Sequence, residues 1–343
     1  MNEITLIHPD DWHCHLRDQE YLERTVADMA GRFKRIIVMP NLSPPIKTAD
    51  SAHAYLKRIE ENMPDHHSFT PLMTLYLTDE TSPQIIKEAK RSGIIKACKL
   101  YPAGATFQSS KGVRSIKNIY PALAAMQEAG ILLLIHGEVI DPAVDIFDRE
   151  AVFIKNVLSP LLKDFPKLRI VLEHVSSEIG VDFVKDGPDN LAATITPHHL
   201  LLNRNDILVS GIHPYHYCLP VVKRSSDQQA LIAAAISGNP KFFLGTDSAP
   251  HAQSAKESCC GPAGIYNALV ALEVYAEIFD QHQALDKLEG FASRFGPDFY
   301  QLPKNKDTIT LIRKPWQVPK SLPYGNETLI PLMAGKTLNW QIK

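Results

Sequence analysis

Near the amino terminus, two histidines stand two residues apart, and an arginine follows two residues later. The segment reads His13-Cys14-His15-Leu16-Arg17. On an extended strand, successive side chains point to opposite faces, so the two imidazoles project to one side while Cys14 points away. Two nitrogen donors on one face form half of a metal site. If the backbone stays extended, Arg17 shares that face and places a positive charge beside the metal, suited to an anionic substrate group.

Other residues that could do chemistry stand at the ends of short, β-rich apolar runs. We predict eight strands, over residues 11–15, 35–41, 69–77, 94–101, 131–138, 168–174, 191–196 and 241–247. Six of these runs carry polar side chains at or near their ends, namely His13 and His15, Asn41, Lys99, His136, His174 and Asp247. Because stretches of helical length separate most of the runs, the pattern favours βαβ units and a parallel sheet.

Eight such units predict an α/β fold in the form of a closed (β/α)8 TIM barrel rather than an open doubly wound sheet. All parallel strands of a barrel end on one rim, so residues far apart in the sequence converge there. We expect one domain over residues 1–343, with a barrel core at about 8–295 and a small C-terminal extension at about 296–343. The long connections at 102–112 and 197–240 are expected to lie at the rim, the first as a lid.

The charge balance points to a small-molecule partner. The 343 residues include 36 lysines and arginines against 38 aspartates and glutamates, a formal net charge of −2. This balance argues against a nucleic-acid or membrane surface, and no stretch approaches the ~20 apolar residues that cross a bilayer. Five cysteines without a Cys-x-x-Cys pair indicate reduced thiols, and we expect a cytoplasmic protein.

The strand-end residues suit a catalytic zinc centre, because Zn²⁺ takes neutral imidazole and carboxylate ligands. Lys99 needs an explanation, since an ammonium group has no lone pair to offer a metal. Addition of CO₂ to its amine would give a carbamate whose two anionic oxygens can bridge two cations. The alternative for Lys99 is a buried ion pair with Asp247.

Two metals that share a water would lower its pKa from 15.7 to roughly 7 and so provide hydroxide at neutral pH. The second metal would polarise a carbonyl oxygen. Asp247, facing the bridging hydroxide, would take its proton and deliver it to the leaving nitrogen. The predicted reaction is hydrolysis of a C–N amide bond, or its reversal.

These residues lie in segments that closely resemble one known family. The segments are HCHLRD, VMPNL, KLYPA, IHGE, DIFDREAVFI, LEH, LAATITPHHL, YCLP and FLGTDSAPH, and the similarity runs over nearly the whole chain. They resemble dihydroorotase of the homodimeric bacterial type, in the amidohydrolase superfamily. The resemblance implies a homodimer that interconverts N-carbamoyl-L-aspartate and L-dihydroorotate plus water, the ring-closing step of de novo pyrimidine (UMP) synthesis.

The resemblance also implies roles for individual residues. One zinc would be held by His13, His15, Lys99 and Asp247, and a second by Lys99, His136 and His174, with Lys99 N-carboxylated as the bridge. The substrate's α-carboxylate would contact Arg17, Asn41 and His251, and the main chain at Leu219 and Ala263 would contact the ring amide and carboxylate.

The expected lid departs from the family at one position. In the family, the loop after the bridging lysine closes on the substrate through two consecutive threonines. Thr106 matches the first, but Phe107 stands in the place of the second. A phenyl ring cannot donate a hydroxyl hydrogen bond, so we expect closure to depend on Thr106 and on apolar exclusion of water.

Three alternatives are weighed on the same residues. A hydantoinase or allantoinase would keep the metals, but Arg17, Asn41 and His251 favour a ring that carries a carboxylate. A catalytically silent barrel that binds a partner enzyme would have lost metal ligands, and none of the expected set is missing. A sugar-phosphate barrel is disfavoured because the last strand ends in Asp247 rather than in a glycine-rich phosphate cradle.

Two further pairs have no clear role from sequence. His198 and His199 follow the seventh run on the expected rim. For the vicinal Cys259 and Cys260, we expect a packed loop near Ala263 rather than a surface redox role.

Overall fold

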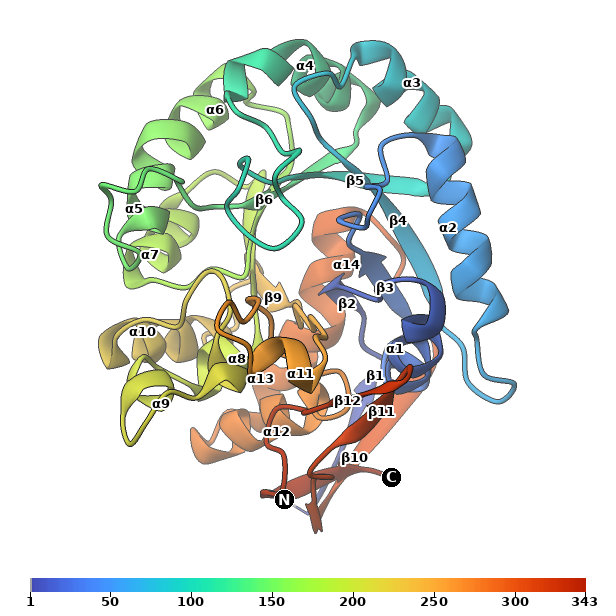
Figure 1. Cartoon of the computed structure of the whole chain (residues 1–343), viewed down its shortest axis with the longest axis vertical. Helices are drawn as coiled ribbons and strands as arrows, with labels where there is room; N and C mark the ends of the chain where they lie inside the picture. Colours follow the sequence, from blue (N-terminus) through green and yellow to red (C-terminus); the bar gives the residue numbers. More distant parts are fainter. Residues whose placement is uncertain (1) are drawn as a thin grey trace.

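Eight parallel strands follow one another around a barrel in chain order in a computed structural model that describes residues 2–343 (Figure 1). They are β2 (Asp11–Cys14), β3 (Arg35–Val38), β4 (Thr70–Tyr76), β5 (Ile95–Leu100), β6 (Leu132–His136), β7 (Ile170–Glu173), β8 (Leu191–Ile195) and β9 (Phe242–Leu244). The ring closes where Cys14 bridges Ser248 and the Asp247 N–H donates to the His13 carbonyl at 2.8 Å. The predicted (β/α)8 barrel is confirmed.

Helices cover the outside of the barrel (Figure 1). The longer ones are α1 (Leu22–Met29), α2 (Ala49–Glu61), α3 (Pro83–Ser92), α4 (Tyr120–Ala129), α7 (Glu178–Asp186), α10 (Ser225–Ile236) and α12 (Ala271–Gln281). The shorter ones are α5 (Arg149–Phe153), α6 (Ser159–Asp164), α8 (Pro197–Leu201), α9 (Asn205–Leu208), α11 (Gln253–Lys256), α13 (Leu285–Glu289) and α14 (Phe295–Tyr300). Tighter 3₁₀ turns are η1 (Gln19–Tyr21), η2 (Ile116–Ile119) and η4 (Pro214–His216), and wider π turns are η3 (Ile154–Leu158) and η5 (Gly290–Arg294).

Helix α3 illustrates how local sequence sets these bounds. Ser82 accepts a hydrogen bond from the Ile85 N–H, and Pro83 begins the helix with a preset φ and no donor to leave unpaired. Gly93 ends it in the left-handed conformation, at φ +73°. These residues set the observed bounds of the helix, Pro83–Ser92.

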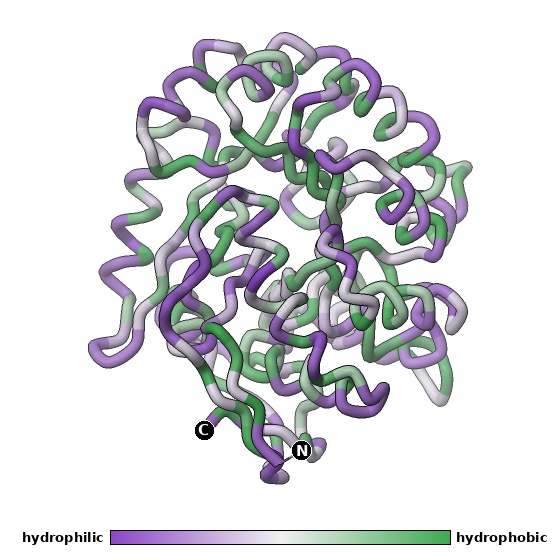
Figure 2. Tube along the Cα trace, turned by 180° about the vertical axis from the view of Figure 1, so that it is seen from behind, coloured by the Kyte–Doolittle hydropathy of each residue, from purple (hydrophilic) through white to green (hydrophobic). Residues whose placement is uncertain are grey.

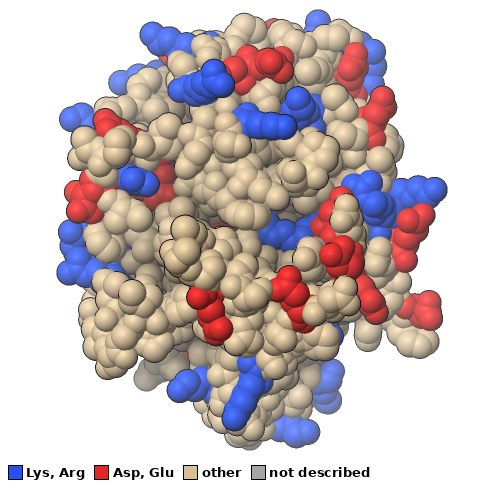
Figure 3. Space-filling view, viewed as in Figure 1, with Lys and Arg blue, Asp and Glu red and all other residues tan. Residues whose placement is uncertain are grey.

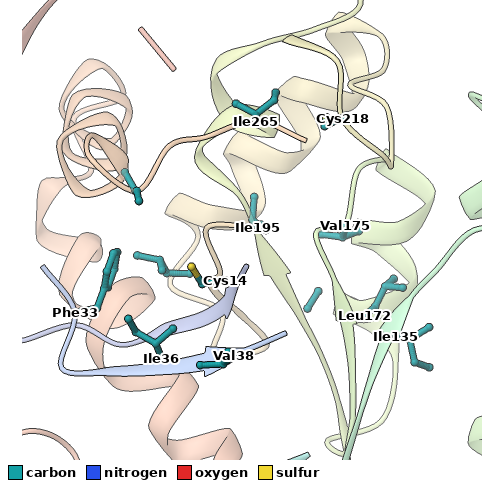
Figure 4. Close-up of a cluster of buried hydrophobic side chains, with 14 of the residues drawn as sticks. Cys14, Phe33, Ile36, Val38, Ile135, Leu172, Val175, Ile195, Cys218 and Ile265 are labelled. Atoms are coloured by element: carbon teal, nitrogen blue, oxygen red, sulfur yellow. The ribbon is translucent and has the colours of Figure 1, made fainter. Parts of the chain in front are cut away.

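Alternation along the strands separates two apolar layers. In β3, Ile37 belongs to the layer that fills the barrel, whereas Ile36 and Val38 pack on the helix side. Cys14 lies in this outer layer beside Ile36 and Val38 (Figure 4), so it points away from the barrel interior as expected. Hydrophilic and hydrophobic residues alternate along the outer helices (Figure 2), as helices with one buried face require.

The two ends of the chain meet in a separate antiparallel sheet, in the order β1 (Glu3–Ile7), β10 (Thr308–Gln317), β13 (Thr337–Ile342). A hairpin of β11 (Leu322–Tyr324) and β12 (Glu327–Leu329) precedes β13. Tyr300, at the end of α14, stacks on Trp12 inside the barrel with ring centroids 4.1 Å apart. The C-terminal segment is thus joined to the barrel both by this stack and by the pairing of β10 with β1.

Within residues 2–343, none of the helices is both long and apolar enough to cross a membrane. Cys259 and Cys260 are exposed, with their sulfurs 3.8 Å apart. The expectation that they pack in a loop is wrong, because the turn after α11 lies at the surface.

Candidate metal centre and substrate pocket

Two histidines and one aspartate converge at the barrel mouth. His13 Nε2 lies 3.3 Å from His15 Nε2 and 3.2 Å from Asp247 Oδ1, and His15 Nε2 lies 3.1 Å from the same oxygen. All three side chains are buried. Ligand atoms at the 2.0–2.1 Å bond lengths of tetrahedral zinc stand about 3.3 Å apart. The separations in the chain match one face of such a site, so these residues fit the metal.

Each imidazole has a side-chain oxygen beside its other nitrogen. His15 Nδ1 pairs with Asn41 Oδ1 at 2.8 Å, and His13 Nδ1 lies 3.2 Å from Glu173 Oε1. Metal-binding histidines usually donate their second N–H to such an oxygen, which orients the ring and leaves the first nitrogen free to ligate. Asn41 therefore supports a candidate ligand, in addition to the substrate contact predicted for it.

A second group of candidate ligands lies beside the first. His136 and His174 meet edge to face with ring centroids 4.8 Å apart, and His174 lies 5.2 Å from the ring of His13. His174 Nδ1 is buried without a hydrogen-bond partner in residues 2–343. An unpaired buried nitrogen is costly, and a metal ion would satisfy it.

Lys99 is fully buried, and its Nζ contacts the Glu173 carboxylate. The alternative ion pair of Lys99 with Asp247 is therefore wrong, because the partner of Lys99 is Glu173. Burial lowers the pKa of Lys99, although Glu173 and Asp247 act to raise it. A lowered pKa increases the fraction of neutral amine, the form that adds CO₂. The nitrogen of a carbamate keeps one hydrogen, so the contact with Glu173 is compatible with carboxylation.

The charges at the centre are arranged around His13. Burial alone would lower the pKa of His13. The charges of Glu173 and Asp247 outweigh burial and raise this pKa to about 9. Burial dominates at His15 and lowers its pKa to about 4. Burial raises the pKa of Asp247, but the charge of His13 and the hydrogen bonds of both histidines hold it well below its usual value. Without metal, His13 is a cation between two carboxylates, so a metal must displace its proton.

Three of these residues have left-handed backbones, with φ of +42° at His174, +44° at Asp247 and +61° at Arg17. Residues other than glycine adopt this conformation at a cost, and they cluster at functional sites. Because β2 ends at Cys14, Arg17 does not reach the mouth by continued strand alternation, and that expectation is wrong. Arg17 instead lies in the turn that follows the strand.

The predicted residues surround one narrow pocket at the mouth. Its walls include His13, His15, Arg17, Asn41, Thr106, Phe107, His136, His174, Leu219, Asp247 and Ala263. His251 joins this wall through its Nε2, 3.1 Å from Arg17 Nη2 and 3.0 Å from the Ala263 carbonyl oxygen. The structure therefore brings together the residues that the sequence analysis singled out, with Lys99 buried among the strands.

Arg17 supplies the positive charge on the substrate side of the pocket. Burial, followed by the charges of Arg17 and Lys256, lowers the pKa of His251 to about 2, so that ring is neutral. On the face of the molecule drawn in Figure 3, acidic and basic side chains are interspersed around the edge, and the atoms over the centre are mostly uncharged. This distribution agrees with a small-molecule site rather than a polyanion surface.

The loop at 102–112 places Phe107 against the residues predicted to bind the substrate. The Phe107 ring lies 5.3 Å from the Arg17 guanidinium and meets His251 edge to face at 4.7 Å. Its carbonyl oxygen accepts a hydrogen bond from Asn41 Nδ2 at 3.3 Å. The residue that departs from the family's pair of threonines thus contacts all three side chains predicted to bind the α-carboxylate.

Sequence reasoning missed two buried acids that support the centre. Glu173 contacts both Lys99 and His13, and Glu138 Oε2 lies 2.8 Å from His136 Nε2. Both acids were visible as charges within or just after apolar strands that end in a histidine, an arrangement that needs a partner for the buried charge.

A second cluster of potential ligands, His198, His199 and Cys218, is also buried. Both nitrogens of His199 are already engaged, Nδ1 with Thr196 Oγ1 at 2.8 Å and Nε2 with the Pro220 carbonyl at 2.9 Å. His199 therefore has no lone pair to spare for a metal, and we assign no ion to this cluster.

Comparison with known proteins identifies close relatives over the full chain. A dihydroorotase from Coxiella burnetii is 64% identical over 343 residues, covering 100% of this chain and 99% of the relative. A solved dihydroorotase from Campylobacter jejuni superposes with a TM-score of 0.92 at 38% identity, covering 100% of this chain and 98% of the other. No family model matches the chain.

A hydantoinase shares the fold at much lower identity. The L-hydantoinase from Arthrobacter aurescens superposes with a TM-score of 0.80 at 16% identity, over 99% of this chain and 83% of that one. This likeness shows the barrel architecture alone.

Proposed function

The chain belongs to the dihydroorotase family and is an enzyme of that activity, and we propose that two zinc ions at its barrel mouth carry out the reaction. The reaction opens the ring amide bond of L-dihydroorotate with water to give N-carbamoyl-L-aspartate, or closes that ring with loss of water. The observation that carries the proposal is the convergence of His13 Nε2, His15 Nε2 and Asp247 Oδ1 at 3.1–3.3 Å from one another, next to a buried arginine.

In this proposal, one zinc would be held by His13, His15, Asp247 and a carboxylated Lys99, and the other by the same Lys99 with His136 and His174. The ions would lower the pKa of a water and polarise the amide carbonyl. The low pKa of Lys99 supports carboxylation, and the unpaired Nδ1 of His174 supports a bound cation.

Arg17, Asn41 and His251 bind the substrate's α-carboxylate, and main-chain groups at Leu219 and Ala263 bind the ring amide and carboxylate. The guanidinium supplies the charge for this contact, while His251 stays neutral because its pKa is about 2. A substrate without a carboxylate would leave Arg17 buried and unpaired, a costly arrangement that selects against hydantoin-like rings.

Asp247 acts as the general acid and base. Its low pKa keeps the carboxylate ionised at neutral pH, so it can accept a proton from the attacking water. It then returns that proton to the amide nitrogen as the C–N bond breaks. In ring closure the same oxygen takes the proton from the carbamoyl nitrogen and delivers it to the departing water oxygen.

The test is an assay of metal-depleted and zinc-restored enzyme on L-dihydroorotate, run beside an unsubstituted hydantoin. We expect activity to return with zinc on the first substrate only. An Arg17→Met variant should raise KM for dihydroorotate by about 100-fold, because it removes a charged hydrogen-bond donor from the carboxylate. Activity on the hydantoin alone would contradict the substrate assignment.

We also propose that the enzyme is a cytoplasmic homodimer, as the resemblance to the homodimeric bacterial type implies. Sedimentation equilibrium should then give twice the 38.3 kDa mass of one chain. A mass of one chain at micromolar concentration would contradict the dimer.

A further inference from the structure

Several groups of the protein contact the guanidinium of Arg17. Nε donates to the Pro250 carbonyl at 3.1 Å, Nη2 lies 3.1 Å from His251 Nε2, and the Phe107 ring covers one face. The remaining nitrogen, Nη1, is buried and makes no hydrogen bond of ordinary geometry within residues 2–343. Such a donor needs a nearby polar group or a ligand.

A second cavity of about 310 Å³ lies on the other side of Arg17 from the metal centre. Arg17 and Phe107 line both this cavity and the substrate pocket, so they form the partition between them. The far side of the cavity is built from Tyr21, Tyr324 and Glu327. Through Tyr324 and Glu327, the C-terminal hairpin β11–β12 therefore reaches the wall proposed to bind the substrate carboxylate.

Tyr324 is fixed in this position by its neighbours. It is buried, with 3% of its surface exposed, and stacks on Tyr21 at 4.3 Å between ring centroids. The hairpin is anchored at two points, since Arg24 Nε donates to the Pro323 carbonyl at 3.2 Å and Ser254 Oγ donates to the Glu327 carboxylate. These contacts tie the hairpin to α1 and α11, the helices that follow Arg17 and His251 in the chain.

The side chains of Arg17 and Tyr324 also interact electrostatically. Burial raises the pKa of Tyr324, and the nearby guanidinium of Arg17 opposes the rise. The phenol stays neutral at physiological pH. A neutral oxygen can support a guanidinium without cancelling its charge, whereas a carboxylate at this place would compete with the substrate.

We propose that Tyr324 is a positioning residue for substrate binding: its hydroxyl, presented by the C-terminal hairpin, holds Arg17 from behind so that the guanidinium faces the substrate's α-carboxylate. The proposal rests on the role given to Arg17 under the proposed function. An arginine already fixed in its binding geometry loses less side-chain entropy when the ligand arrives.

Tyr324→Phe removes the hydroxyl and keeps the ring and its stack. We expect KM for L-dihydroorotate, and the inhibition constant of orotate, to rise together by about three- to tenfold, with kcat within about twofold of the parent. The thermal midpoint should not change, because the packing is preserved. Tyr21→Phe is the matched control, as it removes a hydroxyl from the same stack at a ring whose pKa is influenced by Glu20 and Glu327 rather than by Arg17, and it should leave both constants unchanged.

A double-variant cycle separates positioning from a general structural effect. In the Arg17→Met background, Tyr324→Phe should change the inhibition constant of orotate by less than twofold, because the side chain it positions is gone. An unchanged KM in Tyr324→Phe, or an equal rise in both backgrounds, would overturn the proposal while leaving the proposed function intact. Failure of the parent enzyme to turn over dihydroorotate would instead overturn the proposed function.

Discussion

Glu173→Gln tests how the protein supports the residues proposed as metal ligands. Glu173 is fully buried, contacts Lys99 Nζ and lies 3.2 Å from His13 Nδ1. Glutamine keeps the size of the side chain and removes its charge. Two effects on zinc affinity then oppose each other. Affinity falls because the His13 ring loses the carboxylate that orients it and makes it more basic. Affinity rises because the same carboxylate no longer stabilises the proton that competes with zinc for His13.

The loss of zinc affinity in Glu173→Gln should depend on pH, and this dependence distinguishes the two effects. His13 must be deprotonated to bind zinc, and its pKa without metal is about 9. In the parent, apparent zinc affinity should therefore rise by about 50-fold from pH 7 to pH 9 and level off at about 100-fold well above pH 9. Losing a supporting carboxylate costs about 10- to 100-fold in metal affinity. In Glu173→Gln the pKa of His13 falls, so the pH dependence flattens and the deficit is larger at pH 9 than at pH 7.

The assay is zinc titration of metal-depleted protein against a chelator of known affinity at pH 7, 8 and 9, with kcat measured at saturating zinc. Glu273→Gln is the control, because Glu273 is equally buried but lies on α12, and it should preserve the parent curve. Parallel pH curves for Glu173→Gln and the parent would refute the reasoning that Glu173 sets the proton on His13.

Three further changes have defined outcomes. Thr106→Val should lower kcat with both metals retained, measured by turnover and metal analysis, and parent-like activity would refute the gating role of the loop. Asp247→Asn should lower kcat by about 10²- to 10⁴-fold, because the amide cannot accept the proton; turnover near that of the parent at full zinc loading would rule out its acid and base role. Tyr300→Ala should cost about 3–5 kcal/mol in the free energy of urea unfolding, because it removes the ring stacked on Trp12 at 4.1 Å. A decrease of less than about 1 kcal/mol in the free energy of unfolding would contradict a stabilising role for that stack.

The barrel and most of its mouth could be predicted because both follow from local periodicity. Eight apolar runs separated by helical stretches define the architecture, and strand alternation places Lys99 and His136 on the interior side. Their convergence then follows from the geometry of a closed parallel sheet. Such inferences need no knowledge of how distant loops pack.

The features that could not be predicted depend on tertiary contacts. Arg17 lies beyond the end of β2 and itself has a left-handed backbone, which no extended pattern reveals. Glu173 is paired with Lys99, 74 residues away, so its partner is known only once β5 and β7 are placed in one barrel. Tyr324 reaches the back of Arg17 from a short hairpin whose sequence carries no signal of contact with the mouth.

In the proposed metal centre, six side chains at the mouth cage two divalent ions joined through a modified lysine. Zinc-edge anomalous scattering from crystals of the zinc-loaded enzyme tests it most directly. We predict two peaks about 3.5–4 Å apart, one beside His13, His15 and Asp247 and one beside His136 and His174, with continuous density for a carbamate on Lys99 between them. A single peak, or an unmodified Lys99 still paired with Glu173 beside a fully loaded site, would contradict it.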